Sequence, residues 1–204
     1  IRDSQKQSSV ILLQDAFTSF YEAPLVIHFV NLLQSLGFRV CVAPFRPNGK
    51  PLHIKGLLSW FDLLVRKNSE WLQKLATLGV PIVGIEPSMV LTYRDEYPKS
   101  LGIKQLPVEI LLPQEWLVKQ ADQLRSNRIS EPLRSYRLLG HCSEKTLALQ
   151  SQQQWQNVFK ALGLDLKLEA TGCCGMAGTY GHEKEHYEES RGIFKMSWQH
   201  HMPN

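Results

Sequence analysis

Several features are absent from this sequence, and each absence excludes a class of protein. No apolar stretch approaches the roughly 20 residues that a membrane-spanning helix requires, so no membrane span is expected. The N-terminal residues lack the basic, apolar and small-residue segments of a secretory signal. Four cysteines in 204 residues are too few for a disulfide scaffold. These absences favour a globular protein of the reducing cytosol.

Charge and familiar catalytic motifs are equally sparse. The formal net charge is only +4, and acidic residues are scattered among the basic ones. Because no stretch interleaves lysine and arginine with aromatic residues, nucleic-acid binding is not expected. No phosphate-binding loop, dinucleotide fingerprint or serine–histidine–aspartate set occurs in the required context. The chain begins at Ile1 rather than at methionine, so we expect a segment cut from a longer protein.

Apolar runs alternate with helical periodicity along the first half of the chain. Strands are predicted at residues 10–14, 39–43 and 80–85. A helix from Pro24 to Leu36 should end at Gly37, and two more helices are predicted over residues 57–65 and 70–78. Alternation of this kind predicts an α/β fold with mainly parallel sheets flanked by helices.

The same alternation returns after a bridging segment at residues 111–135. This bridge is predicted to hold a helix starting at Pro113 and a loop at 126–132. A strand at 136–140, a helix ending at Gly163 and a strand at 164–170 then follow. We therefore divide the chain into a first repeat (1–110), the bridge (111–135) and a second repeat (136–204).

An internal duplication underlies this division. At a constant offset of 126 residues, Leu12 falls on Leu138, Phe29 on Trp155, Gly37 on Gly163 and Gly49 on Gly175. Agreement in phase through strand, helix, glycine and strand indicates two copies of one βαβ-type unit. The third strand of the first copy would have its counterpart beyond Asn204, so the second copy is expected to be truncated.

The stretch from Thr171 to Gly181 is the most distinctive in the chain. It places Cys173 and Cys174 side by side among regularly spaced glycines, and Cys142 follows an earlier predicted strand. Vicinal cysteines do not suit a routine structural disulfide. Soft thiolate donors near a tight turn instead favour a metal or an iron–sulfur cluster.

The duplication shows that only the second copy keeps these thiols. Cys142 corresponds to Ala16, Cys173 to Pro47 and Cys174 to Asn48, although Gly49 is retained. The first copy is therefore predicted to have lost its ligands. The remaining cysteine, Cys41, lies inside a predicted strand and is interpreted as a small core residue.

These motifs resemble a known family. Gly140-His141-Cys142 followed by Gly172-Cys173-Cys174-Gly175-Met176-Ala177-Gly178 resembles the cysteine-rich CCG domain. That domain occurs in the heterodisulfide reductase B subunit and in iron–sulfur subunits of glycolate, lactate and anaerobic glycerol-3-phosphate oxidoreductases. The run from Gly181 to Tyr187 looks like the C-terminal part of fused FAD-linked oxidases that act on D-2-hydroxy acids. In the first half, Glu86-Pro87-Ser88-Met89 resembles the family's Glu-Pro-Ser-Cys turn, so the resemblance covers residues 9–199.

The resemblance implies an electron-transfer role within a larger oxidoreductase. Cys142, Cys173 and Cys174 would be ligands of a 4Fe-4S cluster, with His141, Gly172 and Gly175 next to them. FAD and a ferredoxin-like module would lie elsewhere in the same polypeptide or complex, and an external acceptor would take the electrons. The hydroxy acid would be D-2-hydroxyglutarate, D-lactate or glycolate. The implied location is cytoplasmic, with a peripheral position at the inner membrane as a further option.

Two other chemistries remain open from the residues alone. Zinc could be bound by the three cysteines and one of His141, His182 or His186. Alternatively, Cys142 could form a redox disulfide with Cys173 or Cys174. In these cases the chain would be a zinc-binding, thiol-redox or interaction module with no electron-transfer role. Because this chain supplies three thiols where a cluster usually has four ligands, we expect the chain alone to lack a complete cluster and not to turn over.

Overall fold

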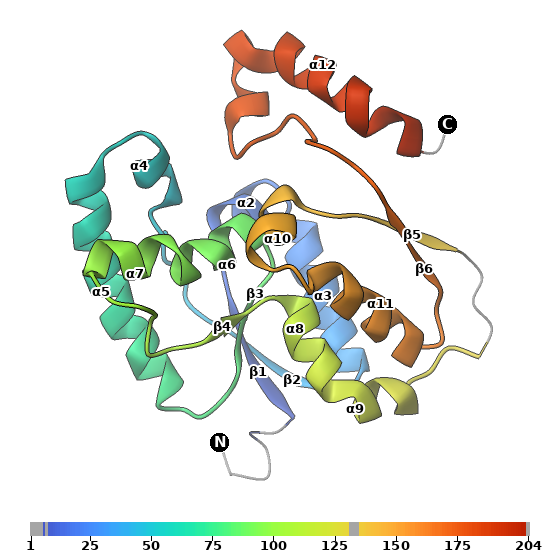
Figure 1. Ribbon diagram of the computed structural model, residues 1–204. Coiled ribbons are helices and arrows are strands. Elements are labelled where there is room, and N and C mark those ends of the chain that lie inside the picture. Colours follow the sequence, from blue (N-terminus) through green and yellow to red (C-terminus); the bar gives the residue numbers. More distant parts are fainter. Residues whose placement is uncertain (1–5, 7, 131–134, 203–204) are drawn as a thin grey trace. The chain divides into compact units, whose positions relative to one another are not determined.

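A computed structural model describes residues 6, 8–130 and 135–202 of the chain. The chain divides into two compact units, residues 1–127 and residues 128–204. Each unit contains a small parallel sheet flanked by helices, which confirms the predicted α/β class (Figure 1). Within the described ranges, no helix is both long enough and apolar enough to span a membrane.

The first unit is built on a four-stranded sheet. Its strands are β1 (Ser9–Leu13), β2 (Arg39–Val42), β3 (Ile82–Gly84) and β4 (Ile110–Leu111), in the order β2-β1-β3-β4. All the neighbouring strands run parallel. Every residue of β1 is buried, as expected for an apolar strand at the centre of a sheet with helices on its faces.

Helices connect these strands and cover the sheet. They are α2 (Ala16–Phe20), α3 (Ala23–Ser35), α4 (Lys50–Ile54), α5 (Leu58–Ala76), α6 (Pro87–Arg94), α7 (Glu96–Leu101), α8 (Pro113–Leu117), the 3-10 turn η1 (Val118–Gln120) and α9 (Ala121–Ser126). The prediction of two helices over 57–65 and 70–78 was wrong, because α5 runs through both. The intervening residues Asn68 and Ser69 continue its buried face between Val65 and Leu72 instead of breaking it.

The second unit holds a two-stranded parallel sheet of β5 (Tyr136–Leu139) and β6 (Leu166–Glu169). Helices α10 (Cys142–Leu147) and α11 (Ser151–Ala161) connect the two strands. After β6 comes the cysteine loop (residues 171–181), whose last two residues belong to the 3-10 turn η2 (Tyr180–His182). A second 3-10 turn, η3 (Lys184–His186), and helix α12 (Tyr187–Ser197) follow. A last 3-10 turn, η4 (Gln199–His201), follows α12.

The two units repeat one backbone design at the offset read from the sequence. Val10 pairs with Val40 in the first sheet, and Tyr136 pairs with Leu166 in the second. Helices α2 and α10 begin at equivalent positions, and α3 and α11 end at equivalent positions. Gly37 and Gly163 follow these last two helices with φ of 87° and 79°, a left-handed conformation that glycine adopts without strain.

The predicted bridge at 111–135 contains short helices that pack in the first unit. Trp116 of α8 is 1% exposed, and its ring lies 4.8 Å from that of Phe38. Residues 131–134, which include the end of the predicted loop at 126–132, lie outside the described residues. The division at residues 110 and 135 stays a prediction.

Two tryptophans that differ in burial can test the assigned core of the first unit. Replacing Trp116 by alanine should lower the free energy of unfolding by about 3–5 kcal/mol, because it leaves a large cavity. Trp60 is 66% exposed, so Trp60→Ala should change that free energy by less than about 0.5 kcal/mol. Urea denaturation of both variants measures the difference, and equal effects would contradict the assigned core.

Candidate functional site

Cys142 lies at the first position of helix α10, just beyond the end of β5. His141 caps this helix, since its Nδ1 accepts a hydrogen bond from the Ser143 N–H at 3.2 Å. The position is equivalent to that of Asp15, which caps α2 in the first unit. The Cys142 thiol is exposed, so the cap presents it to solvent at the carboxyl end of a strand.

Cys173 and Cys174 occupy the loop that follows β6. Cys173 is exposed and Cys174 is half-buried. The N–H of Gly175 donates a hydrogen bond to Cys173 Sγ at 3.3 Å. Backbone N–H donors of this kind commonly support the sulfur atoms of metal-bound cysteines. Gly175 has φ of 88°, like Gly49 at the equivalent position (85°), so the turn predicted from the duplication is present in both units.

Lys145 connects the two cysteine-bearing segments. Its Nζ donates hydrogen bonds to the carbonyl oxygen of Thr171 at 2.6 Å and to Thr171 Oγ1 at 2.9 Å. Because β5 and β6 are parallel, their carboxyl ends meet at one edge of the sheet. The strand pairing and the hydrogen bonds of Lys145 with Thr171 together place α10 and the cysteine loop at that edge.

The donor set suits a thiophilic metal or cluster in kind, but the thiols are not gathered around one point. All four cysteines are free thiols, and three of them lie on the segments just described. Among residues 6, 8–130 and 135–202, no three histidine, cysteine or acidic side chains are placed to hold a metal ion together. Metal binding would therefore require the loop to adjust or a further ligand to be supplied.

The histidines of the zinc alternative take part in other interactions. His186 stacks on Tyr180, with ring centroids 4.1 Å apart, and its Nδ1 lies 3.1 Å from a carboxylate oxygen of Glu189. His141 is the helix cap described above. His182 lies in the 3-10 turn η2.

The equivalent edge of the first unit is filled by a network that includes Asn48, at the position of Cys174. Asn48 is 7% exposed, and its Nδ2 donates to the carbonyl oxygen of Met89 at 3.1 Å. Its Oδ1 accepts from the Lys50 N–H at 3.0 Å, and its carbonyl oxygen accepts from the Tyr97 hydroxyl at 2.8 Å. Asn68 donates to that same hydroxyl at 3.0 Å. Backbone and side chains thus satisfy one another here without any thiol.

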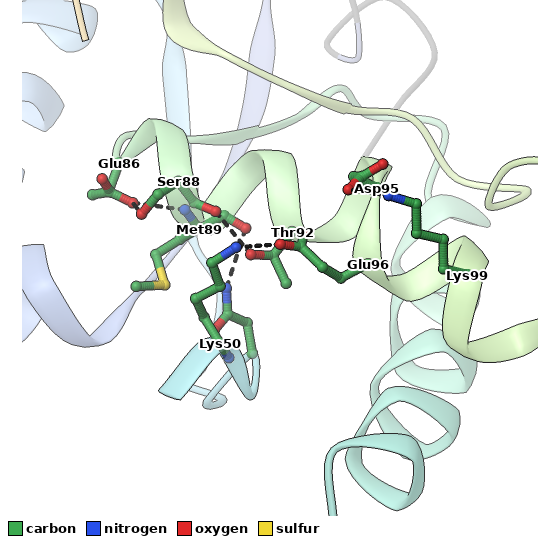
Figure 2. Close-up of polar contacts among 9 residues, drawn as sticks. Lys50, Glu86, Ser88, Met89, Thr92, Asp95, Glu96 and Lys99 are labelled. Carbon is green, nitrogen blue, oxygen red and sulfur yellow. Dashed lines mark hydrogen bonds and ion pairs between the residues drawn. The ribbon is translucent and has the colours of Figure 1, made fainter. Parts of the chain in front are cut away.

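Carboxylates hold the helix starts around this network. Figure 2 shows Glu86 accepting hydrogen bonds from the Met89 N–H at 2.6 Å and from the Ser88 hydroxyl at 2.7 Å, and so capping α6. Lys50 pairs with Glu96 in the same region. A small pocket at the ends of β1 and β3 is lined by Asp15, Glu86 and Tyr93, among others.

Two buried phenols complete this edge, and no sequence pattern pointed to their role. Burial raises the pKa of Tyr93, and the nearby Tyr97 and Asp15 add to that rise. Burial likewise raises the pKa of Tyr97, opposed by its hydrogen bond with Asn68. Both phenols therefore stay protonated at neutral pH, as Tyr97 must to donate to Asn48.

Comparison with known proteins gives these features a context. The chain is homologous to a segment of D-2-hydroxyglutarate dehydrogenases. It is 49% identical over 195 residues to the D-2-hydroxyglutarate dehydrogenase of Pseudomonas putida, a match that covers 96% of this chain and 19% of the relative. It is 42% identical over 194 residues to that of Escherichia coli K12, covering 95% of this chain and 19% of the relative.

A second group of relatives is more distant. One subunit of the anaerobic glycerol-3-phosphate dehydrogenase of Escherichia coli K12 is 25% identical over 198 residues, covering 94% of this chain and 49% of the relative. No family model matches the chain, and no solved structure matches it. The chain spans about a fifth of the length of the D-2-hydroxyglutarate dehydrogenases, so it matches one segment of these dehydrogenase enzymes.

The network around Asn48 predicts a measurable loss of stability. Asn48→Ala should lower the free energy of unfolding by about 1–3 kcal/mol, because buried backbone groups of Met89 and Lys50 lose their partner. The control is Asn31→Ala on the exposed side of α3, which should change it by less than about 0.5 kcal/mol. Chemical denaturation compares them, and an Asn48 variant as stable as the control would count against the network.

Proposed function

We propose that this chain is the iron–sulfur-binding, electron-transfer part of an FAD-linked D-2-hydroxy-acid dehydrogenase of the D-2-hydroxyglutarate type. The observation that carries the proposal is the 49% identity over 96% of the chain to an enzyme of that name, together with thiols at the edge of the second sheet. The flavin, a ferredoxin-like module and the substrate site would lie outside this chain, and an external acceptor would receive the electrons.

Cys142, Cys173 and Cys174 are the residues that would hold a 4Fe-4S cluster. Thiolates are the usual protein ligands of such clusters, and the cluster would supply one-electron transfer between flavin and acceptor. A fourth ligand would come from elsewhere in the intact protein, since this edge supplies three thiols where such a cluster usually has four ligands. One supporting hydrogen bond to a ligand sulfur is already in place, because Gly175 donates to Cys173 Sγ.

The first unit would serve a different purpose in this proposal. Its equivalent positions hold Pro47 and Asn48 instead of cysteines, and Met89 stands where the resemblance suggests a cysteine. Because buried polar groups there are paired with one another, the first unit would act as a rigid support and not as a second redox centre.

Metal analysis of the protein at its natural length tests this proposal. Protein purified without oxygen should contain iron and acid-labile sulfide in similar amounts. Cys142→Ser, Cys173→Ser and Cys174→Ser should each lower both contents by the share of one cluster, about four iron and four sulfide per protein, because hydroxyl oxygen is a poor substitute for a soft sulfur donor. Iron and sulfide held by the ferredoxin-like module should remain. Cys41→Ser is the matched control and should retain both, since Cys41 lies in β2 of the first unit.

The same measurement separates the alternatives. Stoichiometric zinc without sulfide would contradict the proposal and favour a zinc site. Absence of both metals, with thiols lost on oxidation and recovered on reduction, would favour a redox disulfide. Equal iron loss in Cys41→Ser and in the other three variants would show that the thiols named here are not the ligands.

A further inference from the structure

Helix α12 and the residue after it hold the start of the cysteine loop from both sides of Gly172. The N–H of Gly172 donates a hydrogen bond to Ser197 Oγ at 2.6 Å. The carbonyl oxygen of Gly172 accepts one from Trp198 Nε1 at 3.2 Å. Gly172 directly precedes Cys173. Side chains at the end of α12 therefore bind both the N–H and the carbonyl oxygen of the residue before the vicinal cysteines.

The middle and far part of the loop rest on the same helix. Ser190 of α12 is 5% exposed and lies under two glycines of the loop. A Cβ atom at Gly175 would overlap the Ser190 carbonyl oxygen, and one at Gly181 would lie 2.5 Å from Ser190 Oγ. Only glycine allows so close an approach, so these glycines serve packing of the loop onto α12.

Two polar contacts flank this packing. At the loop's far end, the Tyr180 hydroxyl hydrogen-bonds to the Glu189 carboxylate, which also contacts His186. At the other end, His201 Nδ1 lies 3.4 Å from the carboxylate of Glu169, the last residue of β6. The contacts of the loop with α12 and Trp198 therefore extend from Gly172 to Gly181, whereas Cys142 lies on a different helix, α10.

We propose that α12 is a clamp that positions Cys173 and Cys174, with Ser190, Ser197 and Trp198 as its positioning residues. None of these side chains needs to touch the bound group, because they act through the backbone of Gly172 and Gly175. A loop held in advance loses less conformational freedom when its thiols engage a ligand, so the clamp strengthens binding. That these thiols bind a cluster rests on the function proposed above, but the clamp itself does not.

Thiol alkylation in the metal-free protein tests the clamp directly. The protein at its natural length is stripped of metal by a chelator without oxygen and treated with N-ethylmaleimide, and the rate at each cysteine is followed by mass spectrometry. Ser197→Ala should raise the alkylation rate at half-buried Cys174 by about two- to tenfold. This is the factor that corresponds to the free energy lost with one net hydrogen bond. The rate at Cys142 should not change.

Matched variants exclude a general loss of structure. Met196→Ala alters the neighbouring residue of α12, whose side chain is 76% exposed, and should leave all rates unchanged. Ser197→Thr keeps the hydroxyl and should restore the slow rate at Cys174. Trp198→Phe replaces the indole by a smaller ring without an N–H, so it removes the hydrogen bond to Gly172 and provides a second variant should Ser197→Ala fold poorly.

The outcomes distinguish the clamp from the function of the site. Unchanged alkylation at Cys174 in both Ser197→Ala and Trp198→Phe, or an equal rise at Cys142, would overturn the clamp. Wild-type protein without iron would overturn the proposed function but leave the alkylation difference as expected. In iron-containing protein, the clamp also predicts an altered electron paramagnetic resonance spectrum of the reduced Ser197→Ala variant, which Ser197→Thr should correct.

Discussion

The parallel pairing of β5 with β6 is the constraint on which the candidate site depends. It brings the carboxyl ends of both strands to one edge, so that α10 with Cys142 and the loop with Cys173 emerge together. The first unit uses the same register between β1 and β2. Because side chains alternate across a strand, a slip of one residue would reverse every face of the pair. The pairing of β5 with β6 therefore sets the positions from which the cysteine-bearing segments leave the sheet.

The two units show what one backbone can do with different side chains. In the first, Asn48, Tyr97 and the backbone of Met89 pair with one another and form a closed interior. In the second, the equivalent turn keeps its left-handed glycine but presents thiols toward solvent. Satisfied polar groups stabilise a fold and offer no reactive atom, whereas exposed thiols offer ligands. The two units thus differ at this edge in whether polar groups pair with one another or cysteine side chains remain free.

Local sequence signals were enough to predict much of this fold. The strands β1, β2, β3, β5 and β6, the helices α3 and α11, and the glycines that end these helices follow from periodicity and backbone preference within a short stretch. The two-residue strand β4 was not predicted. Contacts between distant residues were not predictable in the same way. The hydrogen bonds of Gly172 with Ser197 and Trp198, and of Tyr97 with Asn48, leave no pattern in one sequence. Only the closely spaced glycines of the loop indicated tight packing, and they did not indicate that α12 is the element packed against them.

The central claim is that thiols from two segments at this edge share one iron–sulfur group. Iron-edge X-ray absorption of the anaerobically purified protein at its natural length measures this most directly, since it reports the atoms bound to iron. The account predicts iron surrounded by sulfur, with iron neighbours at short distance, and about four fewer sulfur-bound iron atoms per protein when Cys173 is replaced by serine. Iron bound mainly by oxygen or nitrogen, or an amount of sulfur-bound iron per protein unaffected by that replacement, would contradict the account.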